Sequence, residues 1–376
     1  MAQFVIVSRR FGDGGASTNR LIGYAKGFAD AGHSVRVVFL IRDAKGTKLN
    51  LSHKNIVIEH LWEHDGVIAK KFKLFSYIKN LLALKKSIKK DDILFTYNAQ
   101  WPNAIILNSC RKMAKIYYET NEHPNIYGNR LIEKLRLYYA KKANGVFVIS
   151  EALRNYYLTN GINNSKILTV NMFVDHSRFE DLNKHSTKKY IAYCGTVSKH
   201  KDGVDDLIAA FKRFSISHPD YLLYIIGDSE SVEEFNSLKD FVKDLQLSEK
   251  VVFVGKIPAQ NMPQLLFDAS ILALARPNNI QSQNGFPTKL GEYLATGNPV
   301  AVTDVGEISL FIKDRINGFV SPPDNIETFA NTLEFIADNY DVAQQVGAKG
   351  KLLIYNEFSY LTQTQKIIKF IFNGEN

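Results

Sequence analysis

The sequence predicts an α/β protein with two doubly wound, Rossmann-like domains, because a strand–loop–helix pattern begins twice along the chain. The first start is a β-rich run over residues 4–7, followed by a glycine-containing turn and a helical pattern. The second start is an apolar run over 190–194, a loop over 195–203 and a helical pattern over 204–215. Strands that alternate with helices in this way form parallel sheets, so we expect one such sheet in each domain.

Length and composition agree with two soluble domains. At 376 residues the chain can form two separate cores. Its 45% hydrophobic and 23% charged residues are ordinary for a globular protein. A polar stretch over 181–189 has the composition of a linker. We therefore expect a first domain over 1–183 and a second over 184–357.

The net charge of +9 indicates an anionic partner, but charge alone does not distinguish nucleic acid, acidic lipid and phosphorylated substrate. No aromatic residues are interleaved with the lysines as in a recognisable nucleic-acid module, so we expect no nucleic-acid binding. No apolar run reaches the length of a membrane span, and no signal peptide is apparent, which predicts a cytoplasmic protein. Cys110 and Cys194 lack metal-site spacing and are expected to be buried in a reducing compartment.

The turn before the first helix contains Gly14 and Gly15, but no G-x-G-x-x-G fingerprint. Asp43, just after the second strand, is therefore only weak support for a ribose contact. Gly15 lies close to the expected helix N-cap, Ser17, and is the stronger candidate for a phosphate-binding loop. Three arginines can add positive charge here: Arg9, Arg10 and Arg20.

A second candidate position follows the strand predicted over 116–119. Glu122 and His123 come just after this strand, where ligands bind in open parallel sheets. A lone histidine is more often structural than catalytic, so both residues are kept as candidates only.

The segment over 67–90 is strongly basic and contains no acidic residue. Its apolar residues, among them Leu81 and Ile88, recur at helical spacing between the lysines. Two interpretations stay open: an amphipathic helix on an anionic membrane surface, or a core-facing helix with a solvated lysine face. A second basic stretch over 130–142 favours the membrane slightly.

The most informative stretch runs from 273 to 307. An apolar run ends at Arg276, a polar loop follows, and a helix is predicted over 288–296 with Gly297 as its end. Lys289 and Glu292 lie one turn apart on this helix. A diphosphate needs positive charge and a ribose diol needs an acceptor, so the pair suits a nucleotide sugar. An exposed salt bridge is the alternative.

The same stretch resembles the donor-site signature of family-4 retaining glycosyltransferases, which have the GT-B fold. In that family two glutamates flank a Gly-Phe-Gly turn. Here Glu292 matches the second glutamate, Asn284 stands at the first, and the turn reads Gly285-Phe286-Pro287. The resemblance implies an acceptor-binding first domain, a nucleotide-sugar-binding second domain, a cleft between them, and a final helix over 358–376 that packs back on the first domain.

The resemblance also assigns roles to the loop over 195–203. In the family an arginine and a lysine of this loop bind the donor diphosphate. Lys201 matches the lysine, whereas Thr196 stands at the arginine, so Lys199, Lys289 or Arg276 would supply the missing charge. Together with catalytic candidates Lys201, Lys289, Asn284, His123 and Glu122, the implied donor-binding residues are Gly15, Gly195, Thr196, Lys199, Gly227, Gly255, Lys256, Ile257, Arg276, Gly285, Phe286, Pro287, Thr288 and Glu292.

These similarities imply a retaining hexosyl- or N-acetylhexosaminyltransferase that uses a UDP- or GDP-sugar and a lipid-linked glycan acceptor in the synthesis of capsule, lipopolysaccharide or another surface polysaccharide. No D-x-D motif is present, so we expect neither a metal nor another cofactor. The alternatives are a sugar-nucleotide epimerase or phosphorylase with the same fold, and a non-catalytic GT-B subunit that supports a partner.

Overall fold

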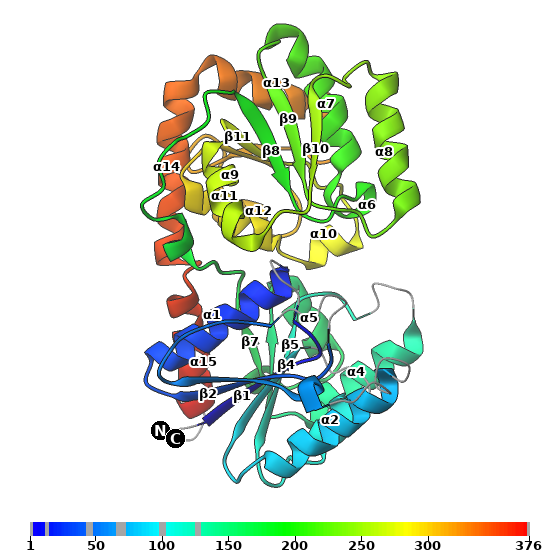
Figure 1. Ribbon diagram of the computed structural model, residues 1–376, viewed down its shortest axis with the longest axis vertical. Helices are drawn as coiled ribbons and strands as arrows, with labels where there is room; N and C mark the ends of the chain where they lie inside the picture. Colours follow the sequence, from blue (N-terminus) through cyan, green and yellow to red (C-terminus); the bar gives the residue numbers. More distant parts are fainter. Residues whose placement is uncertain are drawn as a thin grey trace. The chain divides into compact units, whose positions relative to one another are not determined.

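The computed structural model describes residues 3–11, 15–42, 48–64, 73–97, 103–124 and 129–373. Gly14, Asp43 and the part of the basic segment before residue 73 lie outside these ranges. The chain forms two compact units, Met1–Asn171 with Tyr360–Asn376, and Met172–Ser359 (Figure 1). Residues 172–183, assigned to the first domain from the sequence, thus belong to the second unit.

The first unit contains, within the described ranges, a parallel sheet of seven strands in the order β3-β2-β1-β4-β5-β6-β7. Every neighbouring pair is parallel, as the sequence predicts. The strands are β1 (Gln3–Ser8), β2 (Ser34–Phe39), β3 (Ile56–His60), β4 (Ile93–Tyr97), β5 (Lys115–Thr120), β6 (Gly145–Val148) and β7 (Ile167–Thr169).

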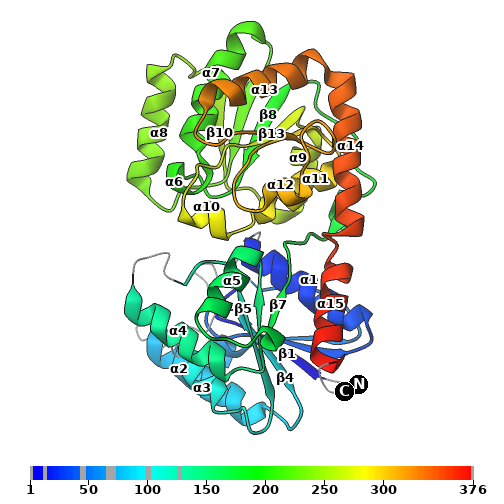
Figure 2. The same cartoon turned by 180° about the vertical axis from the view of Figure 1, so that it is seen from behind.

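Helices cover both faces of this sheet (Figures 1 and 2). They are α1 (Ala16–Asp30), α2 (Lys73–Ser87), α3 (Asn103–Asn108), α4 (Arg130–Lys142), α5 (Glu151–Thr159) and α15 (Tyr360–Asn373), with 3-10 turns η1 (Leu61–His64) and η3 (Asn164–Lys166). The C-terminal α15 packs so closely on α1 that a Cβ at Gly27 would overlap the side chain of Thr364. Buried side chains of α2 and α3 form one core with the sheet.

The second unit contains, within the described part of the chain, six parallel strands in the order β10-β9-β8-β11-β12-β13. These are β8 (Tyr190–Cys194), β9 (Leu222–Ile226), β10 (Val251–Gly255), β11 (Ile271–Leu274), β12 (Val300–Thr303) and β13 (Phe319–Ser321). β8 and β11 are fully buried, as expected for central strands of a sheet covered on both faces.

The helices of the second unit follow the strands in turn. They are η4 (His176–Phe179), α6 (Lys199–Asp202), α7 (Val204–Ser217), α8 (Val232–Asp244), η5 (Ala259–Asn261), α9 (Met262–Asp268), α10 (Ile280–Asn284), α11 (Thr288–Thr296), α12 (Ile308–Phe311), α13 (Ile326–Asp338) and α14 (Tyr340–Asn356). α11 has the predicted bounds, and Gly297 ends it in a left-handed conformation that favours glycine.

Three details of the sequence analysis are settled by the fold. The N-cap of α1 is Gly15, so the expectation of Ser17 is wrong. Cys110 and Cys194 are buried, as predicted. Arg20 is not an available cation, because it is buried in an ion pair with Glu119 and donates to the backbone oxygens of Val170 and Asn171.

No helix within the described residues has both the length and the apolar character needed to cross a membrane.

Candidate active site

The site is organised by the point where the strand order of the second sheet reverses. From the central pair β8 and β11, the chain proceeds outward to β9 on one side and to β12 on the other. Crossover connections therefore diverge above the carboxyl ends of β8 and β11, where open α/β sheets bind their ligands. Gly195 follows β8, and Arg276 follows β11, so the two predicted loops meet at this point.

A buried cluster of charged side chains lies at these strand ends. Its centre is Asp202, the last residue of α6, whose side chain is only 2% exposed. Lys289 Nζ forms an ion pair with Asp202 Oδ2, and Arg276 Nε lies 3.6 Å from Asp202 Oδ1. The Tyr193 hydroxyl is 2.7 Å from Oδ2 and also receives a hydrogen bond from Lys289 Nζ at 3.2 Å. The structure thus brings together Lys289 and Arg276, two of the three residues expected to supply the positive charge that Thr196 lacks.

The electrostatics of this cluster favour three charged groups. Burial by itself raises the pKa of Asp202, but Lys289 and Arg276 outweigh burial and hold that pKa below its ordinary value. Burial lowers the pKa of Lys289, and the attraction of Asp202 offsets only part of this effect. Two cations against one carboxylate leave a net positive charge in a poorly hydrated place, where an anion is bound strongly.

Glycines allow the backbone to approach the cluster. A Cβ at Gly195 would overlap the Lys289 amine, and a Cβ at Gly227 would overlap the backbone oxygen of Gly195. Gly203 has φ +63°, and a Cβ there would overlap the backbone oxygen of Ala275. Because any larger residue would collide there, Gly203 lets Asp202 lie directly against the end of β11.

Arg276 is held in place mainly through its backbone and one edge of its guanidinium. The Thr303 hydroxyl donates to its backbone oxygen at 2.7 Å, and Nε donates to the backbone oxygen of Lys201 at 3.3 Å. The side chain is about as buried as that of Asp202, yet its Nη1 has no hydrogen-bond partner among the described residues. A buried, unpartnered guanidinium nitrogen is costly, and a bound anion would satisfy it.

The N-terminus of α11 also favours an anion beside the cluster. Its N-cap residue, Pro287, provides no capping hydrogen bond, and its first turn contains no acidic residue. The free amides and the helix dipole of such an end attract anions. The helix is fixed to β8 by Tyr293, whose buried hydroxyl accepts a hydrogen bond from the Cys194 N–H at 2.7 Å.

Glu292 is arranged differently from the simple Lys289–Glu292 pair considered from the sequence. Its Oε1 accepts a hydrogen bond from Arg178 Nη1 at 2.6 Å, while Arg178 Nη2 donates to the backbone oxygen of Ala259 at 3.0 Å. Arg178, in η4, was not predicted. It orients the carboxylate that was assigned to the ribose.

Lys201 and Lys199 lie in the same short helix but differ in their surroundings. Lys199 is directed toward α8, where its Nζ donates to Ser237 Oγ at 2.9 Å and its N–H donates to Glu234 Oε1 at 2.7 Å. Lys201 is half-buried, its hydrogen bonds are made by its backbone, and its amine has no hydrogen-bond or ion-pair partner among the described residues. Of the two, Lys201 has the amine available to a ligand.

Two residues of the stretch that carries the glycosyltransferase resemblance already donate hydrogen bonds within α10. Asn284 ends α10, where its Nδ2 donates to the backbone oxygen of Ile280 at 2.9 Å. The Gly285 N–H donates to Gln281 O at 3.1 Å, so this amide serves α10. Phe286 and Pro287 are buried, and Thr288 opens α11.

The remaining candidates lie on other loops. Gly255, Lys256 and Ile257 follow β10 at the edge of the second sheet, where Lys256 is exposed. In the first unit, His123 packs edge-on against Tyr156 with ring centres 4.4 Å apart, and burial lowers the pKa of its imidazole. Glu122 is half-buried beside it in sequence.

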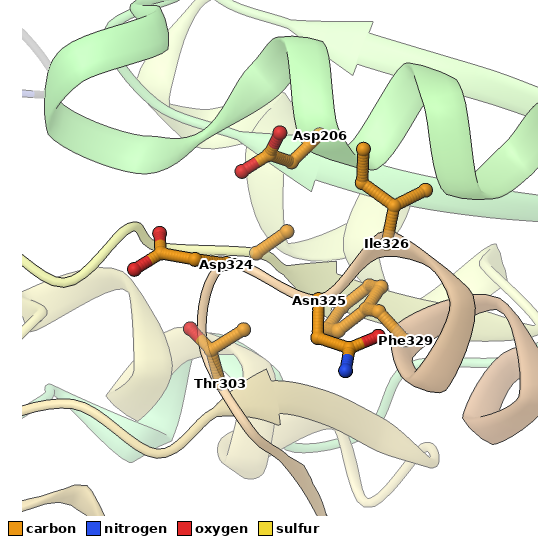
Figure 3. A pocket seen from close by; sticks show the side chains of 7 residues that line it. Asp206, Thr303, Asp324, Asn325, Ile326 and Phe329 are labelled. Carbon is orange, nitrogen blue, oxygen red and sulfur yellow. The ribbon is translucent and has the colours of Figure 1, made fainter.

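A small cavity near the cluster is not a nucleotide site (Figure 3). It has a volume of about 10 Å³, which is room for one water molecule. Asp206 and Asp324 line it together with Thr303, at the end of β12. Burial and the neighbouring Asp205 and Asp324 raise the pKa of Asp206. Carboxylates in so small a space are unsuited to a phosphate.

Asp202, Tyr193 and Arg178 were missed by sequence reasoning. Nothing in the local pattern marks Asp202 as buried, since it follows three polar residues in a loop rich in lysine. Its position immediately before Gly203, which the close approach to β11 requires, is the one signal that the sequence contains.

The chain is similar to known glycosyltransferases. Residues 175–353 match the family model of glycosyl transferases group 1. An uncharacterized glycosyltransferase of Haemophilus influenzae is 25% identical over 74% of this chain and 76% of its own length. The UDP-Gal:alpha-D-GlcNAc-diphosphoundecaprenol alpha-1,3-galactosyltransferase of Escherichia coli is 24% identical over 40% of this chain and 36% of its own.

The fold is that of known GT-B proteins. The structure of HepE from Anabaena, in complex with UDP and glucose, aligns with a TM-score of 0.76 at 14% identity and covers 99% of both chains. At this identity the similarity establishes the fold alone. Two Rossmann-like parallel-sheet domains are the GT-B architecture, and the prediction of the fold class is confirmed.

Proposed function

We propose that this protein is a retaining glycosyltransferase that moves a sugar from a nucleoside-diphosphate sugar to a glycan acceptor. The observation that carries the proposal is the buried Asp202–Lys289–Arg276 cluster at the β8/β11 strand ends, within the segment that matches glycosyl transferases group 1. Its net positive charge, next to the uncapped start of α11, suits a diphosphate.

The chemistry requires little more than stabilisation of a leaving group. As the bond between the anomeric carbon and the β-phosphate oxygen breaks, that carbon becomes cationic and the β-phosphate gains negative charge. The acceptor hydroxyl would form its bond to the carbon on the same face, and its proton would pass to the leaving β-phosphate oxygen. Lys289, Arg276 and the free amine of Lys201 would stabilise the phosphate, so we propose a reaction without a metal ion. Lys289 and Arg276 are held by Asp202 before a substrate arrives. We propose that this preorganisation favours the transition state and so lowers the barrier rather than merely tightening binding.

Asn284 and Glu292 would position the sugar and the ribose of the donor. Asn284 would orient a sugar hydroxyl through a hydrogen bond from its amide. Because this amide is neutral, it would add no negative charge beside the cationic carbon. Glu292, held by Arg178, would accept hydrogen bonds from the ribose diol. We propose a UDP- or GDP-linked hexose or N-acetylhexosamine as donor. The name of the E. coli relative supports a UDP-sugar and a lipid-linked glycan acceptor in surface polysaccharide synthesis.

The test is a transfer assay with the purified full chain. UDP-glucose, UDP-galactose, UDP-N-acetylglucosamine and GDP-mannose are each supplied with GlcNAc-diphosphoundecaprenol, and with chelator present throughout. We expect one donor to give a product whose new linkage keeps the anomeric configuration in NMR spectra. Inversion would contradict the retaining mechanism, whereas epimerised or phosphorolysed donor without transfer would favour the other enzyme classes.

We also propose that the first unit contacts an anionic membrane through α2. Tyr77, Leu81 and Leu84 of this helix are buried in the core, so the core-facing interpretation accounts for one side. The other side of the helix also carries apolar side chains: Phe75 is 71% exposed and Leu82 is 45% exposed. Lysines alternate with these residues along the exposed stripe, which reads Phe75, Lys79, Leu82 and Lys86 at helical spacing.

Exposed rings and aliphatic chains between lysines match a surface of anionic headgroups over acyl chains. α4 adds Leu131, which is 77% exposed, next to Arg130. Flotation with phosphatidylglycerol vesicles tests this contact. Lys79→Gln with Lys86→Gln should weaken binding, and Lys239→Gln with Lys243→Gln on α8 should not. Equal binding by both double variants would refute the α2 contact.

A further inference from the structure

We infer that Asp202 is a positioning residue of the diphosphate site. Its carboxylate holds Lys289 and Arg276 in place and favours the charged form of Lys289. This inference rests on the proposed function, because it concerns how that site is prepared before the donor binds. Asp202 itself would not touch the reacting atoms. Its role is to hold two cations that would otherwise repel each other.

The carboxylate of Asp202 links two cations. A carboxylate accepts hydrogen bonds on both oxygens, and Asp202 directs each oxygen to a different cation. Oδ2 takes Lys289 and the Tyr193 hydroxyl, and Oδ1 faces Arg276 at 3.6 Å. The three partners come from three elements: α11, β8 and the loop after β11. One side chain thus fixes the relative places of all three.

The backbone of Asp202 is itself held in place. Its N–H donates to Ser198 O at 3.3 Å, and the next N–H, of Gly203, donates to Lys199 O at 2.9 Å. Gly203 in its left-handed conformation packs on Ala275 O. The carboxylate therefore has little freedom to move away from β11 when the ligand binds.

Asp202 also affects the charge of Lys289. The described groups that act on the charge of Lys289 are Asp202 from α6, Cys194 from β8 and Arg276 after β11, and the Tyr193 hydroxyl accepts a hydrogen bond from its amine. Glu292 lies on the same helix as Lys289 but is paired with Arg178 of η4. Burial and Arg276 lower the pKa of the lysine, and Asp202 provides the main opposing attraction. Without Asp202 the amine would lose its proton at a lower pH, and the site would lose a positive charge.

The direct experiment is a pH titration of the lysine side chains by NMR, with Lys289 assigned from its absence in Lys289→Met. Asp202→Asn has nearly the same shape without the charge, and we expect it to lower the pKa of Lys289. Arg276→Met removes the neighbouring cation, and we expect the opposite shift. Asp220→Asn is the matched control, because Asp220 pairs with Lys189 in an exposed salt bridge away from the cluster.

Binding provides the second readout. UDP, GDP and inorganic pyrophosphate are titrated into each protein across the alkaline range. As the pH rises, the affinity of Asp202→Asn should begin to fall at a lower pH than that of the wild type. Above the pKa of Lys289, the affinity should fall by about tenfold for each pH unit. Asp220→Asn should follow the wild type.

The outcomes separate the two ideas. An unchanged Lys289 pKa in Asp202→Asn overturns the inference, even if the wild type binds UDP. Failure of the wild type to bind any of the three probes counts against the proposed function, while the NMR titration still decides the role of Asp202. If Asp202→Asn does not fold, Asp202→Ser is titrated in its place, and an unchanged Lys289 pKa in that variant would likewise overturn the inference.

Discussion

Replacing Lys289 by methionine tests the site most directly. The substitution keeps most of the length of the side chain and removes its charge. Removing one preorganised donor from a developing oxyanion typically lowers kcat by about 10²–10³, or roughly 3–4 kcal/mol. We expect a loss of this size for Lys289→Met, because the amine lies in the buried cluster and the helix start of α11 positions it.

Stability should change less than activity. A buried carboxylate left wholly without a partner costs about 3–5 kcal/mol. After Lys289→Met, Asp202 still has Arg276 at 3.6 Å and the Tyr193 hydroxyl, so the loss of folding free energy should stay below that range. The measurements are kcat with the preferred donor, and urea unfolding of the same samples.

Lys243→Met on α8 is the control, since Lys243 forms an exposed pair with Asp240. Folded Lys289→Met protein with kcat within about threefold of the wild type would refute the assignment of Lys289 to charge stabilisation. A loss in Lys243→Met as large as in Lys289→Met would show that the assay reports something other than the cluster.

Three further outcomes are expected. Asn284→Ala should lower turnover only modestly, because Asn284 is neutral and its amide already donates to Ile280 O; a loss as large as that of Lys289→Met would contradict this. Tyr293→Phe removes the acceptor of the Cys194 N–H and should destabilise the second unit by about 1–3 kcal/mol in urea unfolding, and an unchanged midpoint would argue against it. The pKa of Asp202 is lowered on folding, so its pairing stabilises the protein above the pKa of an unfolded aspartate and is lost as the pH falls through the folded pKa. Thermal unfolding from pH 7 downward should therefore show a smaller loss of stability in Asp202→Asn than in the wild type, and parallel curves would disprove the linkage.

Local patterns in the sequence determined most of the strands and helices that position the site, although the short helices α6 and α10 formed in stretches expected to be loops. The helix over 288–296 could be placed to the residue, since apolar spacing marks its face and Gly297 marks its end. The strand-to-loop junctions at Gly195 and Gly227 were likewise readable, because glycine and polar residues interrupt apolar runs. Periodicity and turn chemistry act over a few residues, so the sequence by itself is sufficient to predict them.

Only the tertiary structure decided which charges pair. Lys289 meets Asp202 across 87 residues, and Arg178 meets Glu292 across 114. The same folding removed Arg20 from the available cations by burying it against Glu119, and turned Lys199 toward Ser237. The physical reason is that ion pairs depend on which strand ends become neighbours. The parallel pairing of β8 with β11 brings distant loops together, and burial there makes their charges interact strongly.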